Sequence, residues 1–299
     1  MSQNHSQIKV YCRKVIAYDN LTKWAEDIMA KISFIGGGVM AEAIISRVLS
    51  ENLIAANNIL VGEPSEQRRL LLKEKYVVHT TNNNIEAVED SDLIFLCVKP
   101  QDLKNVLVGL TSIVNPTAAI VSIAAGIPIE YIKTHTGGHN RIVRVMPNTP
   151  AQIGEGMSIW TSTEITQTQF DLTSDILQTI GLEIYVQNEK LLDMSTALSG
   201  SGPAYVFLFI ESMIDAGVKL GLPRDSARTM VIQTVVGSIG LLKETAQHPS
   251  VLKDSVTSPG GTTAAALLEL EKGNFKATIV QAVVTAFEKS TSMMKDANQ

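Results

Sequence analysis

A run of glycines early in the chain has the spacing that a dinucleotide pyrophosphate requires. Residues 31–41 read KISFIGGGVMA, in which Gly36, Gly38 and Ala41 fit the pattern Gly-x-Gly-x-x-Gly/Ala between an apolar run and a helical pattern. Gly36 permits a tight turn, Gly38 lets the backbone approach the phosphates, and Ala41 lets the helix pack closely on the strand. Free N–H groups and the positive end of the helix dipole then favour an anion. The motif therefore predicts a dinucleotide site and, with it, redox chemistry.

An acidic residue follows the next expected strand. Glu63 comes roughly 20 residues beyond the glycines, where a carboxylate hydrogen-bonds the adenosine ribose and disfavours a 2′-phosphate. Glu63 therefore favours NADH. Arg68 and Arg69 follow closely and are of the type that binds a 2′-phosphate, although a solvated helix face is the more ordinary place for them. The residues alone leave the choice between NADH and NADPH open, with Glu63 on the side of NADH.

Two segments in the second half combine glycines with hydroxyl side chains. Residues 198–205 read LSGSGPAY, and residues 256–263 read VTSPGGTT directly before a helical run. The second segment places Gly260 to Thr263 at a helix N-terminus, where N–H groups and hydroxyls converge without a charged side chain. A small substrate that carries a carboxylate suits such a cradle.

Short apolar runs alternate with helical spacing from Lys31 onward. These runs cover residues 32–35, 59–61, 76–79, 93–98, 119–123 and 142–146, with two more at 157–160 and 183–186. Apolar strands separated by helices are typical of a parallel sheet covered on both faces, the doubly wound α/β arrangement. Such sheets bind ligands at the carboxyl ends of their strands, where we expect Val98-Lys99-Pro100 and Ala124-Ala125-Gly126.

After about Glu189 the strand-like runs stop and the pattern becomes helical. Four segments, 203–219, 223–245, 261–272 and 274–296, read as helices with proline or glycine at their boundaries. Their small residues allow close packing, and an apolar helical lobe beside a complete sheet favours a dimer over a bundle within one chain. We therefore expect an N-terminal extension over 1–30 with no assigned role, a Rossmann-like, mostly parallel dinucleotide-binding domain over 31–189, and an all-helical dimerisation domain over 190–299.

Composition narrows the class of protein. A net charge of −5 argues against a nucleic-acid surface, and two cysteines without matching histidines argue against a disulfide framework or a metal site. The most apolar run, 204–210, is far shorter than the ~20 residues of a membrane span. The first residues lack the apolar core of a signal peptide. We expect a cytoplasmic protein without nucleic-acid, membrane or metal partners.

Taken together, the segments resemble the pyrroline-5-carboxylate reductase family. The carrying segments are FIGGGVMAEAI, LCVKPQ, SIAAGI, RVMPNTP, ALSGSGPAY, GVKLGLP and, most specifically, SPGGTTAAALLELE, in the family's order over about residues 31–296. The resemblance implies hydride transfer from NAD(P)H, commonly NADPH in this family, to 1-pyrroline-5-carboxylate. The product is L-proline, in the last step of proline biosynthesis. It also implies a homodimer or a larger homo-oligomer formed through the helical domain.

The resemblance further implies roles for individual residues. The cofactor residues are Ile35, Gly36, Gly37, Gly38, Val39, Met40, Glu63, Asn84, Val98, Lys99, Pro100, Ala124, Ala125 and Gly126. The substrate residues are Glu189, Gly261, Thr262 and Thr263. We expect the N–H groups around Gly261 and Thr262 to fix the substrate carboxylate. The Thr263 hydroxyl, as the catalytic group, should hydrogen-bond the ring nitrogen.

Two other functions are alternatives. Another imine or hydroxyacid reductase would share the glycine turn, but such enzymes usually use a lysine of the helical domain as acid and base. Lys219, which lies between the two glycine-hydroxyl segments, fits a cation at a helix C-terminus instead. A non-catalytic, dinucleotide-sensing regulator would keep the turn without needing the substrate loop, which is intact here.

Overall fold

The computed structural model describes residues 8–9 and 30–297. Contacts along the chain divide it into two units. The first runs to Gly200 and takes up the end of the chain from Ala286, and the second covers Ser201–Thr285. The first unit therefore holds the sheet, α7 and the last turns of α12, and the second holds the other C-terminal helices.

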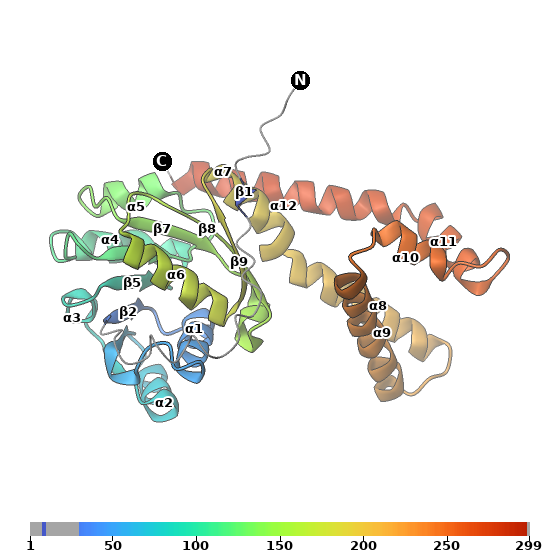
Figure 1. The fold of residues 1–299 in the computed structure, drawn as a ribbon, viewed down its shortest axis with the longest axis horizontal. Helices are drawn as coiled ribbons and strands as arrows, with labels where there is room; N and C mark the ends of the chain where they lie inside the picture. The colour runs from blue at the N-terminus through green and yellow to red at the C-terminus, as the bar shows by residue number, and fades with distance from the viewer. Residues whose placement is uncertain (1–7, 10–29, 298–299) are drawn as a thin grey trace, which may run out of the picture. The chain divides into compact units, whose positions relative to one another are not determined.

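Among the described residues, nine strands form one sheet in the first unit (Figure 1). In order across the sheet they are β1 (Ile8–Lys9), β9 (Gly181–Val186), β8 (Gly156–Ser162), β7 (Ile142–Met146), β6 (Ala119–Ser122), β5 (Leu93–Leu96), β2 (Ile32–Ile35), β3 (Ile59–Gly62) and β4 (His79–Thr81). All neighbours are parallel except β7 with β8 and β1 with β9. The predicted mostly parallel sheet is confirmed.

Helices cover both faces of this sheet. One face carries α1 (Val39–Ser50), α2 (Glu66–Tyr76) and α6 (Gln167–Thr179), and the other carries α3 (Asn84–Val88), α4 (Pro100–Leu110) and α5 (Ile129–His135). Alternate strand residues enter the two cores: Phe34 and Phe95 stack at 5.0 Å in the first, while Ile35 and Leu96 pack in the second. Because both faces are buried, the central strands are apolar along their whole length.

Two segments differ from the sequence expectation. The run 76–79 was predicted as a strand, but only His79 belongs to β4, because α2 continues to Tyr76 and ends at Val77 in the left-handed conformation (φ 59°). The N-terminal extension received no role, yet its residues 8–9 form β1 against Tyr185 and Val186 of β9. Residues 1–7 and 10–29 lie outside the described part of the chain.

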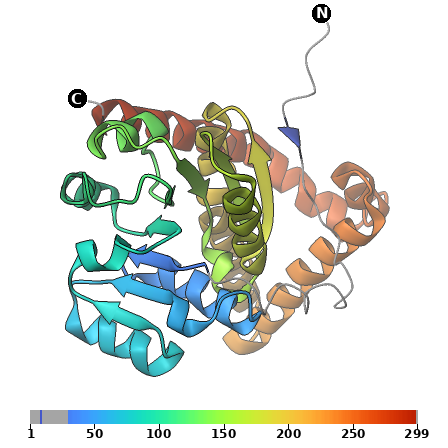
Figure 2. The ribbon, with the colours of Figure 1, turned by 60° about the vertical axis from the view of Figure 1, so that its left-hand side comes forward.

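All regular structure of the second unit is helical, as predicted (Figures 1 and 2). It comprises α8 (Gly202–Lys219), α9 (Arg224–Thr245), α10 (Pro249–Ser255), α11 (Thr262–Lys272) and the start of α12 (Phe275–Ala297). The short helix α10 was not predicted from the sequence. Gly221, with φ of 100°, and Pro223 form the turn between α8 and α9.

The second unit buries little of its own apolar surface. Ala227 and Val231 are its only buried apolar residues, and large side chains stand exposed along its helices, among them Phe207, Leu208, Met230, Val236 and Ile239. By length and composition the helical stretch Lys190–Lys219 is even apolar enough to cross a membrane. This stretch begins in the first unit and continues into the second, and polar residues interrupt its apolar runs, so no single run in the sequence indicates it. Helices with so much exposed apolar surface need a partner to cover them.

Candidate active site

The glycine turn follows β2 in the middle of the sheet. Gly36 has φ of 97°, and its N–H donates to the carbonyl of Gly62 at 2.7 Å. A Cβ at Gly36 would lie 2.9 Å from the carbonyl oxygen of Cys97, so the position accepts only glycine. A Cβ at Gly38 would meet no atom within 4 Å, and no side chain caps the α1 N-terminus behind it. Gly38 and the start of α1 thus present open backbone and uncapped N–H groups, which fit a dinucleotide phosphate.

Two further predicted cofactor segments lie at the same edge of the sheet. β2 pairs in parallel with β5, and β5 with β6, so their carboxyl ends are adjacent. Val98-Lys99-Pro100 follows β5, and Ala124-Ala125-Gly126 follows β6. The Ala124 N–H donates to Ser122 Oγ, and Gly126 turns the chain with φ of 72°. The sheet therefore brings these segments beside Gly36–Met40, where doubly wound folds bind ligands.

The carboxylate of Glu63 accepts hydrogen bonds from the main chain of the glycine turn and of the residues that follow β3. Its Oε2 accepts the N–H of Gly37 at 2.7 Å, and its Oε1 accepts the N–H of Ser65 at 2.9 Å. Arg68 Nε donates to the carbonyl of Gly37, and Arg69 Nη1 donates to the carbonyl of Glu63 at 2.7 Å. Glu63 therefore holds the glycine turn to the end of β3, and Arg68 holds the turn to α2. Arg69 contacts only the main chain that follows β3.

Asn84, the first residue of α3, lies at the carboxyl end of β3. Its Oδ1 is 2.6 Å from where a Cβ of Gly62 would stand. Gly62 must therefore lack a side chain for Asn84 to reach the edge that carries Glu63.

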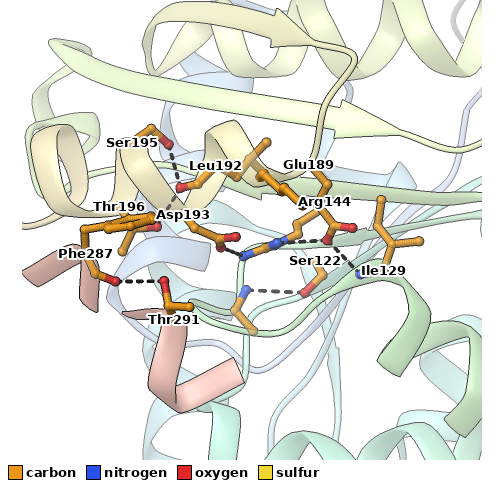
Figure 3. Close-up of polar contacts among 12 residues, drawn as sticks. Ser122, Ile129, Arg144, Glu189, Leu192, Asp193, Ser195, Thr196, Phe287 and Thr291 are labelled. Atoms are coloured by element: carbon orange, nitrogen blue, oxygen red, sulfur yellow. Dashed lines mark hydrogen bonds and ion pairs between the residues drawn. The ribbon is translucent and has the colours of Figure 1, made fainter. Parts of the chain in front are cut away.

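Glu189 belongs to a buried ion-pair cluster that the sequence analysis missed (Figure 3). Arg144 of β7 lies between two carboxylates. Its Nη1 is 2.8 Å from Oε1 of Glu189, and its Nη2 is 2.8 Å from Oδ1 of Asp193, which belongs to α7 (Lys190–Ser195). Glu189 Oε1 also accepts the N–H of Ile129 at 2.8 Å. A lone arginine inside the apolar run IVRVM was the signal in the sequence, because a buried charge requires partners.

Asn148 is a second residue that the sequence analysis missed. It follows β7, and its Nδ2 donates to the carbonyl of Ser199 at 3.1 Å, while its Oδ1 accepts the N–H of Met157 at 2.8 Å. Ser199 lies in the π-helical turn Thr196–Gly200, a type of turn that is frequent at functional sites. Asn148 thereby ties the motif LSGSGPAY to the sheet.

The predicted substrate loop lies in the second unit. Gly260 has φ of 69°, and the N–H of Gly261 donates to the carbonyl of Ser258 at 3.0 Å. No side chain caps α11, so the first N–H groups of this helix, at Thr262 and Thr263, have no acceptor within it. The loop therefore resembles the segment at Gly38, because both are glycine-containing segments that precede an uncapped helix N-terminus.

Chemistry by a metal or a thiol finds no support in the described residues. No group of three His, Cys, Asp or Glu side chains in 8–9 and 30–297 is placed to hold a metal ion. Burial raises the pKa of the Cys97 thiol far above its ordinary value, which suppresses the thiolate.

Glu42 lies in the first helical turn of α1 and binds Arg68, the residue that contacts the glycine turn. It accepts hydrogen bonds from Lys75 at 2.9 Å, from Tyr76 at 2.8 Å and from Arg68. Burial by itself raises the pKa of Glu42, but the bonds from Lys75, Arg68 and Tyr76 outweigh it and lower the pKa from 4.5 to about 2. The folded state therefore releases the proton more readily than the unfolded chain does.

This depressed pKa predicts an acid-sensitive contribution to stability. It is fully present above pH 4.5 and is lost as the pH falls through about 2. Glu42→Gln is expected to lower the free energy of unfolding at neutral pH by about 1–3 kcal/mol and to flatten the decline in acid. Urea unfolding across this pH range measures both effects. Glu51→Gln, which removes only an exposed pair with Arg47, is the control; an unchanged acid decline in Glu42→Gln would contradict the assignment.

Comparison with known proteins matches both halves of the chain. Residues 189–293 match the family model described as pyrroline-5-carboxylate reductase dimerisation, and residues 31–126 match the model described as NADP oxidoreductase coenzyme F420-dependent. A pyrroline-5-carboxylate reductase from Synechocystis is 42% identical to this chain, over 89% of this chain and 98% of the relative. One from Arabidopsis thaliana is 40% identical, over 88% of this chain and 95% of the relative. The chain belongs to the pyrroline-5-carboxylate reductase family.

A solved structure of the family has the same fold. The pyrroline carboxylate reductase of Plasmodium falciparum, determined with NADP bound, is 37% identical, covers 89% of this chain with 98% of its own, and has a TM-score of 0.82. The family model over the second half is that of a dimerisation region, which implies a homodimer.

Proposed function

We propose that the Gly261–Thr263 loop and Glu189 bind the substrate, and that the edge of the sheet binds NAD(P)H. As a family member, the protein catalyses hydride transfer from NAD(P)H to the C=N carbon of 1-pyrroline-5-carboxylate, giving L-proline. One observation carries the placement of the substrate: the family-specific segment SPGGTT forms an uncapped helix N-terminus without a charged side chain. Such a terminus suits the carboxylate of a small substrate.

The chain's own groups then bind and orient the substrate. The N–H groups around Gly261 and Thr262 fix the carboxylate, and the Thr263 hydroxyl hydrogen-bonds the ring nitrogen. Bound NAD(P)H supplies the hydride, so the protein needs no nucleophile. Its contribution is placement and electrostatic stabilisation.

The proposed cofactor site follows the edge of the sheet. The residues proposed to hold the dinucleotide are Ile35–Met40, Glu63, Asn84, Val98–Pro100 and Ala124–Gly126. Their support is the open turn at Gly38 and the adjacency of the carboxyl ends of β2, β5 and β6. In this arrangement the pyrophosphate lies at the α1 N-terminus and the adenosine ribose lies near Glu63.

We propose that Glu63 favours NADH over NADPH, because its carboxylate repels a 2′-phosphate. Glu63→Gln is expected to raise the ratio of kcat/KM with NADPH to kcat/KM with NADH by about tenfold. The measurement is oxidation of each cofactor with pyrroline-5-carboxylate as substrate. Glu66→Gln, at the first residue of α2, is the matched control. A strong preference of the unmutated protein for NADPH would show that Arg68 or Arg69 outweighs the carboxylate, and no turnover with either cofactor would defeat the proposed site.

The remaining organisation follows the same proposal. We place the functional boundary between the dinucleotide domain and the helical domain at residue 189, where the dimerisation model begins. The exposed apolar surface of the helical domain suits a homodimer or a larger homo-oligomer. The acidic composition with only two cysteines agrees with a cytoplasmic location.

A further inference from the structure

A buried arginine, Arg144, forms an ion pair with Glu189. Arg144 is the third residue of β7, and strand alternation turns its side chain away from the core that holds Val143 and Val145. Its side chain is 3% exposed, which an arginine tolerates only when its charge is paired. The two partners are the carboxylates of Glu189 and Asp193, one helical turn apart (Figure 3).

The two oxygens of Glu189 have different surroundings. Oε1 accepts both Arg144 Nη1 and the main-chain N–H of Ile129, each at 2.8 Å. Oε2 has no hydrogen-bond partner among the residues that the structure describes, and 31% of the Glu189 side chain is exposed. One oxygen is therefore fixed to the sheet and to the start of α5, while the other is free to meet a ligand.

Asp193 gives the arginine its orientation. Arg144 Nη2 contacts Asp193 Oδ1, so the planar guanidinium is held at both ends and cannot rotate away from Glu189. The cluster also combines two carboxylates with one guanidinium and so carries one excess negative charge. A protonated imine, the better hydride acceptor, is complementary to that charge.

We propose that Arg144 is a positioning residue for the reaction: with Asp193 it holds Oε1 of Glu189 and thereby presents Oε2 to the positively charged ring of the substrate. This inference rests on the proposed contact of Glu189 with the substrate. Arg144 itself touches neither substrate nor cofactor. Its effect on the reaction must therefore pass through Glu189.

A double-mutant cycle tests this dependence. The variants are Arg144→Lys, Glu189→Ala and the two together, because a lysine keeps the charge but cannot span two carboxylates. Arg144→Lys is expected to lower kcat/KM for pyrroline-5-carboxylate by about tenfold. When Glu189 is already alanine, Arg144→Lys should lower kcat/KM by roughly twofold at most. Dinucleotide affinity, measured by cofactor fluorescence, should not change in any variant.

Arg141→Lys is the matched control, since Arg141 precedes the same strand and donates to the carbonyl of Thr117 instead of to a carboxylate. Equal losses from Arg144→Lys in both backgrounds would overturn the positioning role. No effect of Glu189→Ala alone would instead overturn the proposed substrate contact of Glu189. Urea unfolding establishes that each variant folds; if Arg144→Lys does not, Asp193→Asn replaces it in the cycle with the same expected non-additivity.

Discussion

Thr263→Ala is expected to lower turnover of pyrroline-5-carboxylate by up to ~10²-fold, the lower end of the effect of deleting an oxyanion donor. Thr263 lies in the first turn of α11, at an N-terminus that no side chain caps. Its hydroxyl is proposed to hydrogen-bond the ring nitrogen, an interaction that gains strength as the hydride arrives. The loss should therefore appear mainly in kcat.

Thr263→Ser is the matched control, because it keeps the hydroxyl and removes only a methyl group. Its turnover should stay within a few-fold of the unmutated protein's. Dinucleotide affinity should be unchanged in both variants, since Thr263 is not among the residues proposed to hold the dinucleotide. Unchanged kinetics in Thr263→Ala would remove Thr263 from the mechanism.

Gly38→Ala is expected to weaken dinucleotide binding by about 10–100-fold without destabilising the fold. The backbone at Gly38 has φ of −70°, and an added Cβ meets no atom within 4 Å, so the folded chain accepts alanine. The same methyl group would occupy the space that the pyrophosphate needs to reach the N–H groups of α1. Titration of cofactor fluorescence measures the affinity, and urea unfolding measures the stability.

Gly36→Ala provides the contrast. Its φ of 97° and the carbonyl of Cys97 at 2.9 Å from the added Cβ strain the folded state itself, by roughly 1–3 kcal/mol. Gly36→Ala should therefore lose both stability and affinity, whereas Gly38→Ala loses affinity alone. Full dinucleotide affinity in Gly38→Ala would mean that the phosphate does not approach this turn.

The features that could be predicted correctly from the sequence are those that depend on neighbouring residues in the chain. The glycine turn, the strands of the sheet and the main helices of the second half each depend on a local pattern of apolar, glycine and proline residues. The signature SPGGTT likewise identified the family before any fold was known. Local patterns were weaker at boundaries: the strand expected at 76–79 begins only at His79, because α2 includes Tyr76 and Val77 then adopts the left-handed conformation.

Only the tertiary structure decided which side chains meet. Glu63 and Gly37 are 26 positions apart, Arg144 and Glu189 are 45 apart, and Asn148 and Ser199 are 51 apart. Periodicity shows which face of a strand a residue occupies, but not which helix covers that face. Arg144 in an otherwise apolar strand signalled that a partner must exist, because a buried charge is costly when unpaired. The order of the strands and the packing of α7 selected Glu189 and Asp193 as that partner, and so turned a residue of the core into a candidate support for the active site.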